Sequence, residues 1–413
     1  MKKSVANTKR GNLFNQITIN DGGIVRCQQQ QKKKKSDQIC KGKRTSNNSS
    51  REQMDIDEPH FKEEIIMEIL SKLPVRSILR FKCVSKYWET LMSDPYFKMM
   101  HLNHAKNSQK LVISQCCPEG NIFSMYCLPL SSVQPVENVQ KLDFPLISTP
   151  YRCAIQGSCD GLVIICVNDN IDVERNIRLL WNPSTGESVL LPPPVFSMTG
   201  GCRLGFGYDS TSGDYKILKI YPQIDIPGEI LALKSSSWRT VDKHHGGICN
   251  VISGTHSLPF VNEAFHWIGV SGNYSVVSFS ISNEVYGEIP LPQQILCLRG
   301  NIYIGVSVLE GLLCVHSSSN HDRNVSFKLW VLKDYGVKES WNALFIIEDP
   351  CLFNTIPIYR FEDGEVLFWG INVDCPGHSF RTSRGPFALW PRCDTFQTGT
   401  AFTGSLISPK SVI

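Results

Sequence analysis

Between residues 58 and 100 the apolar positions follow the spacing of amphipathic helices. In the first helical stretch they recur at offsets of three and four, at Ile65, Ile66, Ile69, Leu70 and Leu73. Pro74 ends this helix, because proline cannot continue the hydrogen-bond ladder. Two further short helices are predicted before Asp94-Pro95, which favours a turn and closes the unit. Three helices in about 40 residues cannot bury all their apolar side chains internally, so the pattern predicts a partner.

Beyond about residue 105 short apolar runs alternate with Gly, Pro, Asn and Asp, and one phrase recurs. GLVIIC at 161–166, with Leu180-Trp181 downstream, is echoed by GLLCVH at 311–316, with Leu329-Trp330 downstream. Degraded copies begin near residues 264 and 364. A spacing near 50 residues is typical of four-stranded, kelch-like propeller blades. Residues 105–413 have room for about six such blades, although periodicity alone does not exclude a large β-sandwich.

Residues 1–57 are rich in Gln, Lys, Ser and Asn and show no helical or strand period. This composition predicts a disordered arm. The first 50 residues contain 12 Lys and Arg against two Asp, a charge of +10, and the remaining residues carry −6. A mildly acidic body with a basic arm is not typical of a nucleic-acid-binding domain, so no nucleic-acid partner is expected.

The basic residues of the arm gather in two clusters. They are Lys32, Lys33, Lys34, Lys35, Lys41, Lys43 and Arg44. Two interpretations stay open, a nuclear import signal and a solvated charge run.

The cellular compartment is also constrained by features of the chain. No apolar run approaches the ~20 residues of a spanning helix, and the N-terminus lacks the apolar core of a secretory signal. The 16 cysteines are scattered without a CxxC pair, which favours reduced thiols. We therefore expect no membrane association and a location in the nucleus, the cytoplasm or both.

Motifs for chemistry are sparse. The sequence contains no nucleophile elbow, P-loop, dinucleotide fingerprint or zincin motif, and we expect neither catalysis nor a cofactor. His101 and His104, with Cys116-Cys117 downstream, form the sharpest metal candidate, but the cysteines lack the paired spacing of a zinc site. The recurring tryptophans are interpreted as blade core: Trp181, Trp238, Trp267, Trp330, Trp341 and Trp369.

The segment IIMEILSKLPVRSILRFKCVSKYWETLMSDPYF resembles the F-box. The resemblance implies a small three-helix F-box over residues 58–100 that docks onto a Skp-type adaptor and, through it, a cullin–RING ubiquitin ligase. The candidate adaptor-binding residues are Phe61, Ile65, Ile69, Leu73, Pro74, Val75, Leu79, Val84 and Trp88. For Val84 and Trp88, packing inside the helical unit is an equally good interpretation. The chain departs from the family pattern at Phe61-Lys62, where an opening Leu-Pro is usual.

The β region also resembles a known family. GSCDGLVIIC, LLWNPSTGESVLLPPP, GFGYDSTSGDYKILKIY and EAFHWIG are similar to the F-box-associated interaction domain of plant F-box proteins, including the S-locus type. The resemblance implies a plant protein with a kelch-like platform over residues 105–413 for recognising a target. From about residue 371 the match fails, so an irregular final part is expected.

These features predict the substrate-recognition subunit of a Skp–cullin–F-box ubiquitin ligase, a non-catalytic role with an unknown protein as target. Two alternatives remain. One is a propeller-fold enzyme such as a kelch-type oxidase, and the other is a scaffold without a ligase role.

Overall fold

The computed structural model describes most of the chain from residue 62 onward. The described residues are 62–117, 122–130, 139–146, 152–168, 176–196, 201–222, 226–244, 248–251, 257–297, 301–321, 324–348, 352–370, 379–381, 385–387 and 397–413. The predicted disordered arm at 1–57 and its basic clusters lie outside this set, as does Phe61. Among the described residues no helix has the length and apolar character needed to cross a membrane.

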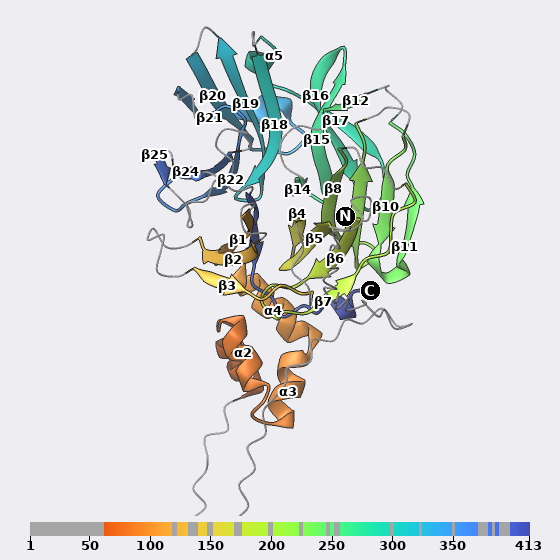
Figure 1. Ribbon diagram of the computed structural model, residues 1–413, viewed down its shortest axis with the longest axis vertical. Coiled ribbons are helices and arrows are strands. Elements are labelled where there is room, and N and C mark those ends of the chain that lie inside the picture. Colours follow the sequence, from red (N-terminus) through yellow and green to blue (C-terminus); the bar gives the residue numbers. More distant parts are fainter. Residues whose placement is uncertain are drawn as a thin grey trace, which may run out of the picture.

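A helical unit comes first and is followed by an all-β ring, which confirms the predicted fold class (Figure 1). The helices are α1 Glu63–Ser71, α2 Val75–Phe81, α3 Lys86–Ser93 and α4 Pro95–Ala105. The fourth helix corrects the expected stop at Asp94-Pro95. Pro95 occupies the first turn of α4, where its missing N–H costs nothing, and the Asp94 side chain accepts a hydrogen bond from the Tyr96 N–H at 2.7 Å.

In the described residues the β region forms six sheets, the number of blades expected from the sequence. Sheet 1 contains β26 Gln397–Thr403, β1 Gln109–Cys117, β2 Ile122–Pro129 and β3 Gln140–Leu142. Sheet 2 contains β4 Arg152–Cys159, β5 Leu162–Asn168, β6 Asn176–Trp181 and β7 Ser188–Leu190. Sheet 3 contains β11 Ser237–Thr240, β10 Glu229–Ala232, β9 Asp214–Ile220, β8 Arg203–Asp209 and β13 Ser257–Leu258.

The other three sheets complete the circle. Sheet 4 contains β12 Cys249–Val251, β15 Ala264–Ser271, β16 Asn273–Ser280 and β17 Tyr286–Pro290, with β14 Phe260–Val261 also paired to β15. Sheet 5 contains β18 Asn301–Leu309, β19 Leu312–His321, β20 Asn324–Leu332 and β21 Trp341–Glu348. Sheet 6 contains β22 Thr355–Arg360, β23 Val366–Gly370, β24 Ser379–Arg381 and β25 Gly385–Phe387. Short helical turns are α5 Gln293–Leu296, η1 Leu233–Ser235, η2 Lys338–Ser340 and η4 Pro409–Ser411. Consecutive sheets pack against one another around the ring, and Figure 1 shows the helices below it.

The ring is closed by β26, which pairs antiparallel with β1 over Gln109–Gln115. We expected an irregular final part from about residue 371. In the described residues of that part, β24 and β25 extend sheet 6, and β26 completes sheet 1 instead of the sheet next to it in sequence. Closure by a distant strand removes the exposed edge that β1 would otherwise present.

The repeated GL phrase marks two-residue hairpin turns. Asp160-Gly161 and Glu310-Gly311 both have positive φ at each residue, as a tight turn between twisted strands requires. Asn262-Glu263 takes the same conformation in sheet 4, which explains why that copy of the phrase lacks its glycine.

The ring has two edges. The near edge is the one where β26 ends and β1 begins, and it carries the hairpin turns at 160–161, 210–213, 262–263 and 310–311. Bonds between neighbouring sheets align these turns: Tyr215 Oη to Asp160, Ser282 Oγ to Asp209, and Arg360 to Glu310. The strands that follow the turns therefore end at the opposite or far edge, as β5, β9 and β19 do.

Cores between adjacent sheets contain most of the recurring tryptophans. Trp181, Trp267, Trp330 and Trp369 are buried, which confirms the core interpretation for them. Trp238 and Trp341 are half-buried, and their indole N–H groups donate to the carbonyls of Pro192 and Pro290. The cysteines whose side chains are described carry free thiols.

Candidate functional site

The helical unit packs on the near edge of the ring. Its core consists of Leu70, Val75, Ile78, Leu91, Met92 and Phe97, together with Leu406 from the segment after β26. Gly404 lies so close to Val75 and to Ser184 of sheet 2 that an added Cβ would be 3.7 Å from the Val75 Cγ2 atom and 3.5 Å from the Ser184 hydroxyl. The segment 404–407 thus lies between the helices and the ring.

Three of the predicted adaptor-binding residues expose large apolar side chains. Ile65 is 46% exposed, Ile69 is 59% exposed and Val84 is 65% exposed. Ile65 and Ile69 are one turn apart on α1, so their side chains share one helix face. Pro74 is exposed at the start of α2. Exposed apolar side chains grouped in this way mark an interaction surface.

The remaining predicted residues lie deeper. Leu73, Leu79 and Trp88 are half-buried against the helical core, and Val75 is 6% exposed within it. Val75 therefore packs against the chain's own core in this structure and is not accessible to a partner. Leu406 enters the same core from a position remote in sequence, and no spacing within residues 58–100 could have revealed that contact.

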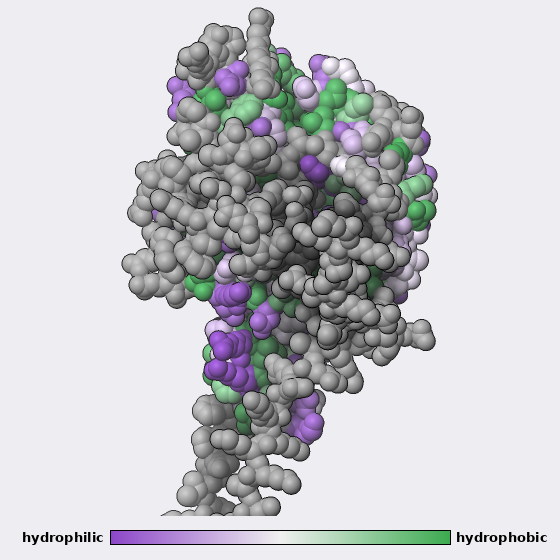
Figure 2. All heavy atoms as spheres, in the orientation of Figure 1, coloured by the Kyte–Doolittle hydropathy of each residue, from purple (hydrophilic) through white to green (hydrophobic). Residues whose placement is uncertain are grey.

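Other exposed apolar residues of the unit were missed as candidates. They are Phe81, Tyr87, Tyr96 and Met99. The Phe81 and Trp88 rings stack with their centroids 5.9 Å apart, and the Tyr87 hydroxyl donates to the Glu63 carboxylate at 3.2 Å. Phe81 belongs to the FKCVSK motif, so the sequence contained the signal for its position. Figure 2 shows green apolar and purple hydrophilic residues side by side over this unit.

Local hydrogen bonds set the directions of these helices. Ser85 caps α3, and its hydroxyl accepts from the Trp88 N–H at 3.3 Å. Surface ion pairs join Glu68 to Lys72 and Lys86 to Glu89, each at 2.8 Å. Exposed pairs of this kind contribute at most about 1 kcal/mol, so helix capping and the apolar core position the exposed side chains.

The metal candidate is not assembled in the described residues. His101 is buried, and its Nε2 atom lies 2.9 Å from the Leu73 carbonyl oxygen, while the His104 Nδ1 atom lies 2.9 Å from the Ser71 hydroxyl. The side chains of Cys116 and Cys117 lie outside the described set. No group of three or more His, Cys, Asp or Glu residues with metal-binding geometry occurs in the described part of the chain. Both histidines thus connect helices of the unit to one another.

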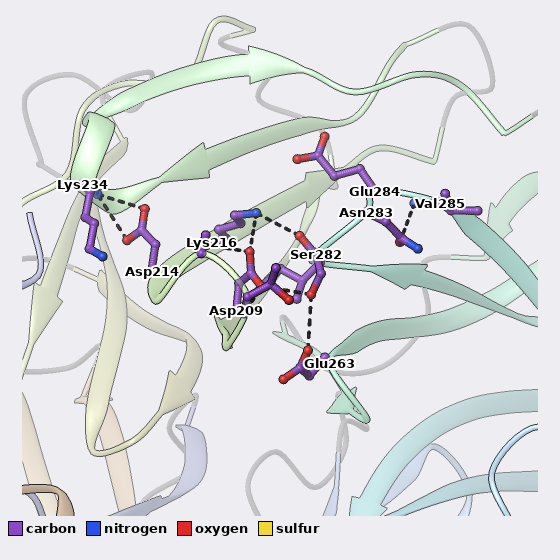
Figure 3. Close-up of polar contacts among 12 residues, drawn as sticks. Asp209, Asp214, Lys216, Lys234, Glu263, Ser282, Asn283, Glu284 and Val285 are labelled. Carbon is purple, nitrogen blue, oxygen red and sulfur yellow. Dashed lines mark hydrogen bonds and ion pairs between the residues drawn. The ribbon is translucent and has the colours of Figure 1, made fainter.

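A polar cluster joins sheets 3 and 4 at the near edge (Figure 3). Asp209 is 1% exposed and accepts four hydrogen bonds, from the Thr211 N–H, the Ser212 and Ser282 hydroxyls and Lys216 Nζ. Lys216 Nζ also donates to the Ile281 carbonyl at 3.0 Å. Burial acts to raise the pKa of Asp209, but these hydrogen bonds outweigh burial and lower the pKa. An ionised carboxylate with all its acceptor positions occupied stabilises the junction and has no capacity left for acid–base catalysis.

Four segments that connect the short apolar runs of the sequence are candidate loops for target recognition, at 168–176, 222–228, 242–257 and 317–324. Residues 169–175, 223–225, 245–247, 252–256 and 322–323 of these segments lie outside the described set. The described strands beside them end or begin at the far edge, because each follows a strand that starts from the near edge. The described ends of the four segments therefore lie at one edge, which is opposite the edge that contacts the helical unit.

Comparison with known proteins supports the division of the chain into a helical unit and a β ring. The family model for the F-box associated beta propeller domain matches residues 117–368, and the model for the F-box domain matches residues 63–100. An F-box/kelch-repeat protein of Arabidopsis thaliana is 28% identical over 321 residues, covering 74% of this chain and 83% of that protein. The F-box protein CPR1 of Arabidopsis thaliana is 24% identical over 316 residues, covering 70% of this chain and 73% of that protein. A solved structure of the SapL1 lectin in complex with alpha methyl fucoside is similar at 8% identity with a TM-score of 0.37, covering 72% of this chain and 96% of that one.

Proposed function

We propose, from the premise that this chain belongs to the F-box proteins with an F-box associated beta propeller domain, that it is the substrate-recognition subunit of a Skp–cullin–F-box ubiquitin ligase. The observation that carries the proposal is the exposure of the apolar side chains of Ile65 and Ile69 on α1 and of Val84 in the turn between α2 and α3, all within the residues that match the F-box model. In this function the helices bind a Skp-type adaptor and the ring binds a target protein.

The chain's contribution to the reaction is one of position. Binding both the ligase and the target converts an encounter between two molecules into one within a single complex, which raises the effective concentration of a target lysine near the conjugating enzyme. A fixed packing of the helical unit on the ring supports this role, because Leu406 belongs to the core of one and follows a strand of the other. The chain itself then needs no catalytic group, and the function is non-catalytic.

The proposal is tested by co-purification with a Skp-type adaptor. Ile69→Glu combined with Val84→Glu places two charges on the exposed surface without entering the core, so the fold should persist and adaptor recovery should fall at least tenfold. The matched control is Val285→Glu, a similarly exposed valine on the ring. Unchanged adaptor recovery with the double variant would contradict the proposal, and circular dichroism checks that both variants are folded.

The basic arm adds a proposal about location, which rests on the sequence. The residues Lys32 to Lys35 and Lys41 to Arg44 would act as a nuclear import signal. Changing both clusters to Ala should move a tagged protein from the nucleus to the cytoplasm. An unaltered distribution by fluorescence microscopy would leave the solvated-tail interpretation.

A further inference from the structure

Residues 404–412, which follow β26 and are called here the closing segment, belong to two apolar cores at once. Leu406 is 4% exposed and enters the helical core, which also contains Leu70 and Val75. Ile407 and Val412 pack against the core between sheets 2 and 3 of the ring. In Figure 1 the dark-blue chain after β26 lies on the side of the ring that faces the helices. A displacement of this short segment therefore disturbs the packing of both parts of the protein.

Two turns of sheet 2 hold the closing segment on the ring. The buried side-chain amide of Asn182 donates hydrogen bonds to the carbonyls of Ser405 and Ile407. These two carbonyls flank Leu406. At the other turn Gly161 lies so close to the segment that an added Cβ would be 2.4 Å from the Ser405 hydroxyl oxygen. The ring thus fixes the backbone on both sides of the leucine that enters the helical core.

Other contacts between the helices and the ring are few. Among the described elements, none of α1–α4 packs extensively on a strand, and the chain itself connects α4 to β1 through residues 106–108. One electrostatic contact reaches the same part of the ring. Burial lowers the pKa of Lys82 at the end of α2, and Glu187, next to the Asn182 turn, acts in the opposite direction. The closing segment is therefore the main physical route by which the packing of the ring affects the packing of the helices.

We propose that the closing segment couples adaptor binding to closure of the ring, so that the helices bind a Skp-type adaptor with full affinity only while Leu406 occupies their core. The two coupled states are a docked segment and a released one. Release removes a side chain that packs in the core with Leu70, and Leu70 is the neighbour of the exposed Ile69 on α1. The inference rests on the proposed function, because it concerns the regulation of the same adaptor surface.

Asn182→Ala tests the coupling from the side of the ring. Asn182 is 0% exposed and lies outside the helical core, so it cannot touch the adaptor. A change in adaptor affinity then has to be transmitted through the segment that Asn182 holds. The Kd of the full-length variant for a purified Skp-type adaptor should rise about fivefold or more, since coupling between two sites usually changes affinity by at least that factor. Isothermal titration calorimetry measures the Kd at a temperature at which circular dichroism shows each protein folded.

Leu313→Ala is the matched control for a general loss of stability. Leu313 is 1% exposed in the core between sheets 4 and 5, whereas the closing segment packs in the helical core and between sheets 2 and 3. Removing a buried leucine destabilises the ring by a comparable amount, but it should leave the adaptor Kd unchanged. An unchanged Kd for Asn182→Ala, or an equal rise for both variants, would overturn the inference.

Amide hydrogen exchange tests the reverse direction, because coupling between two binding equilibria is reciprocal. A saturating amount of adaptor should slow exchange at residues 404–407 and in the turn at 182–187. Exchange should not change in the turn at 333–340 of sheet 5, which also lies at the near edge. Without adaptor, Asn182→Ala should speed exchange in α2, and Leu313→Ala should not. Exchange at 404–407 that ignores the adaptor, or exchange in α2 that ignores Asn182→Ala, would contradict the coupling.

Failure of the inference is distinguishable from failure of the proposed function. If the wild-type protein bound no adaptor, the proposed function would fail, and hydrogen exchange in the free proteins would still decide whether the closing segment links the ring to the helices. If the wild-type protein and Asn182→Ala bound the adaptor equally well, the proposed function would stand and the coupling alone would be wrong.

Discussion

The side-chain amide of Asn182 donates a hydrogen bond to the backbone carbonyl of Ser405 at 3.0 Å, although 223 residues separate the two. The same amide donates to the Ile407 carbonyl at 2.8 Å, and the Asn182 oxygen accepts from the Ser184 N–H at 2.8 Å. One fully buried side chain in a turn of sheet 2 therefore holds the segment that follows β26. The contact links ring closure to the packing of the helical unit, because Leu406 lies between the two bonded carbonyls.

Asn182→Ala should lower the free energy of unfolding by about 2 to 4 kcal/mol, because two buried carbonyls and one turn N–H lose their partner. Chemical denaturation followed by circular dichroism measures the change. Asn283→Ala is the matched control, since Asn283 occupies a comparable turn in sheet 4, is exposed and caps only the Val285 N–H. Equal effects of the two changes would contradict a special role for Asn182.

Gly161→Ala and Gly311→Ala form a second matched pair. Both glycines have φ near +80°, at +82° and +77°, so alanine at either position adds backbone strain of about 1 to 2 kcal/mol. At Gly311 a Cβ would meet no atom within 4 Å, whereas at Gly161 it would lie 2.4 Å from the Thr403 carbonyl oxygen. The melting temperature should therefore fall much further for Gly161→Ala, and a difference within error would show that the 403–405 segment moves away freely.

Leu406→Ala tests whether the helical unit and the ring share a core. The loss of a buried leucine should cost about 2 to 5 kcal/mol, and it should speed amide hydrogen exchange in α1 and α2 as well as in β26. Leu296→Ala, at a 39% exposed position in α5, is the control and should change neither. Exchange in α1 and α2 that stays unchanged with Leu406→Ala would mean that the helices fold independently of this segment.

Asp209→Asn should destabilise the protein at pH 7 by about 3 to 5 kcal/mol, because Lys216 is buried and loses its counter-ion. The pKa of Asp209 is lowered in the folded state, so the ionised form stabilises the fold above the unfolded-state value of about 3.9, and this contribution is lost as the pH falls below it. The difference in unfolding free energy between the two proteins should shrink from pH 7 to pH 3. Asp334→Asn, at an exposed position, is the control. If the difference in unfolding free energy between the wild type and Asp209→Asn did not depend on pH, the stabilising role of the ionised Asp209 carboxylate would be contradicted.

The helical unit and the repeated hairpins could be predicted because their signals are local. Offsets of three and four identify α1, and the GL phrase identifies tight turns whose backbone needs positive φ. Asp94-Pro95 was misinterpreted because the same two residues that stop one helix can cap and begin another. Spacing alone does not separate these cases.

Features that depend on distant partners were beyond sequence reasoning. β26 has the sequence QTGTAFT, which lacks strong apolar alternation, and its strand conformation is determined by pairing with β1. Val75 was assigned to the adaptor surface from its place beside Pro74 in the motif, whereas it is buried in a core that also contains Leu406.

The pairing of β26 with β1 also determines when the protein becomes functional during its own synthesis. A ribosome makes β26 after every other described strand, so β1 waits with an unpaired edge while the five intervening sheets emerge. The helices leave the ribosome first, but their core lacks Leu406 until translation has passed that codon. A chain interrupted before residue 397 would thus combine an open β edge with an incomplete helical core, and we expect it to engage chaperones before it can engage an adaptor.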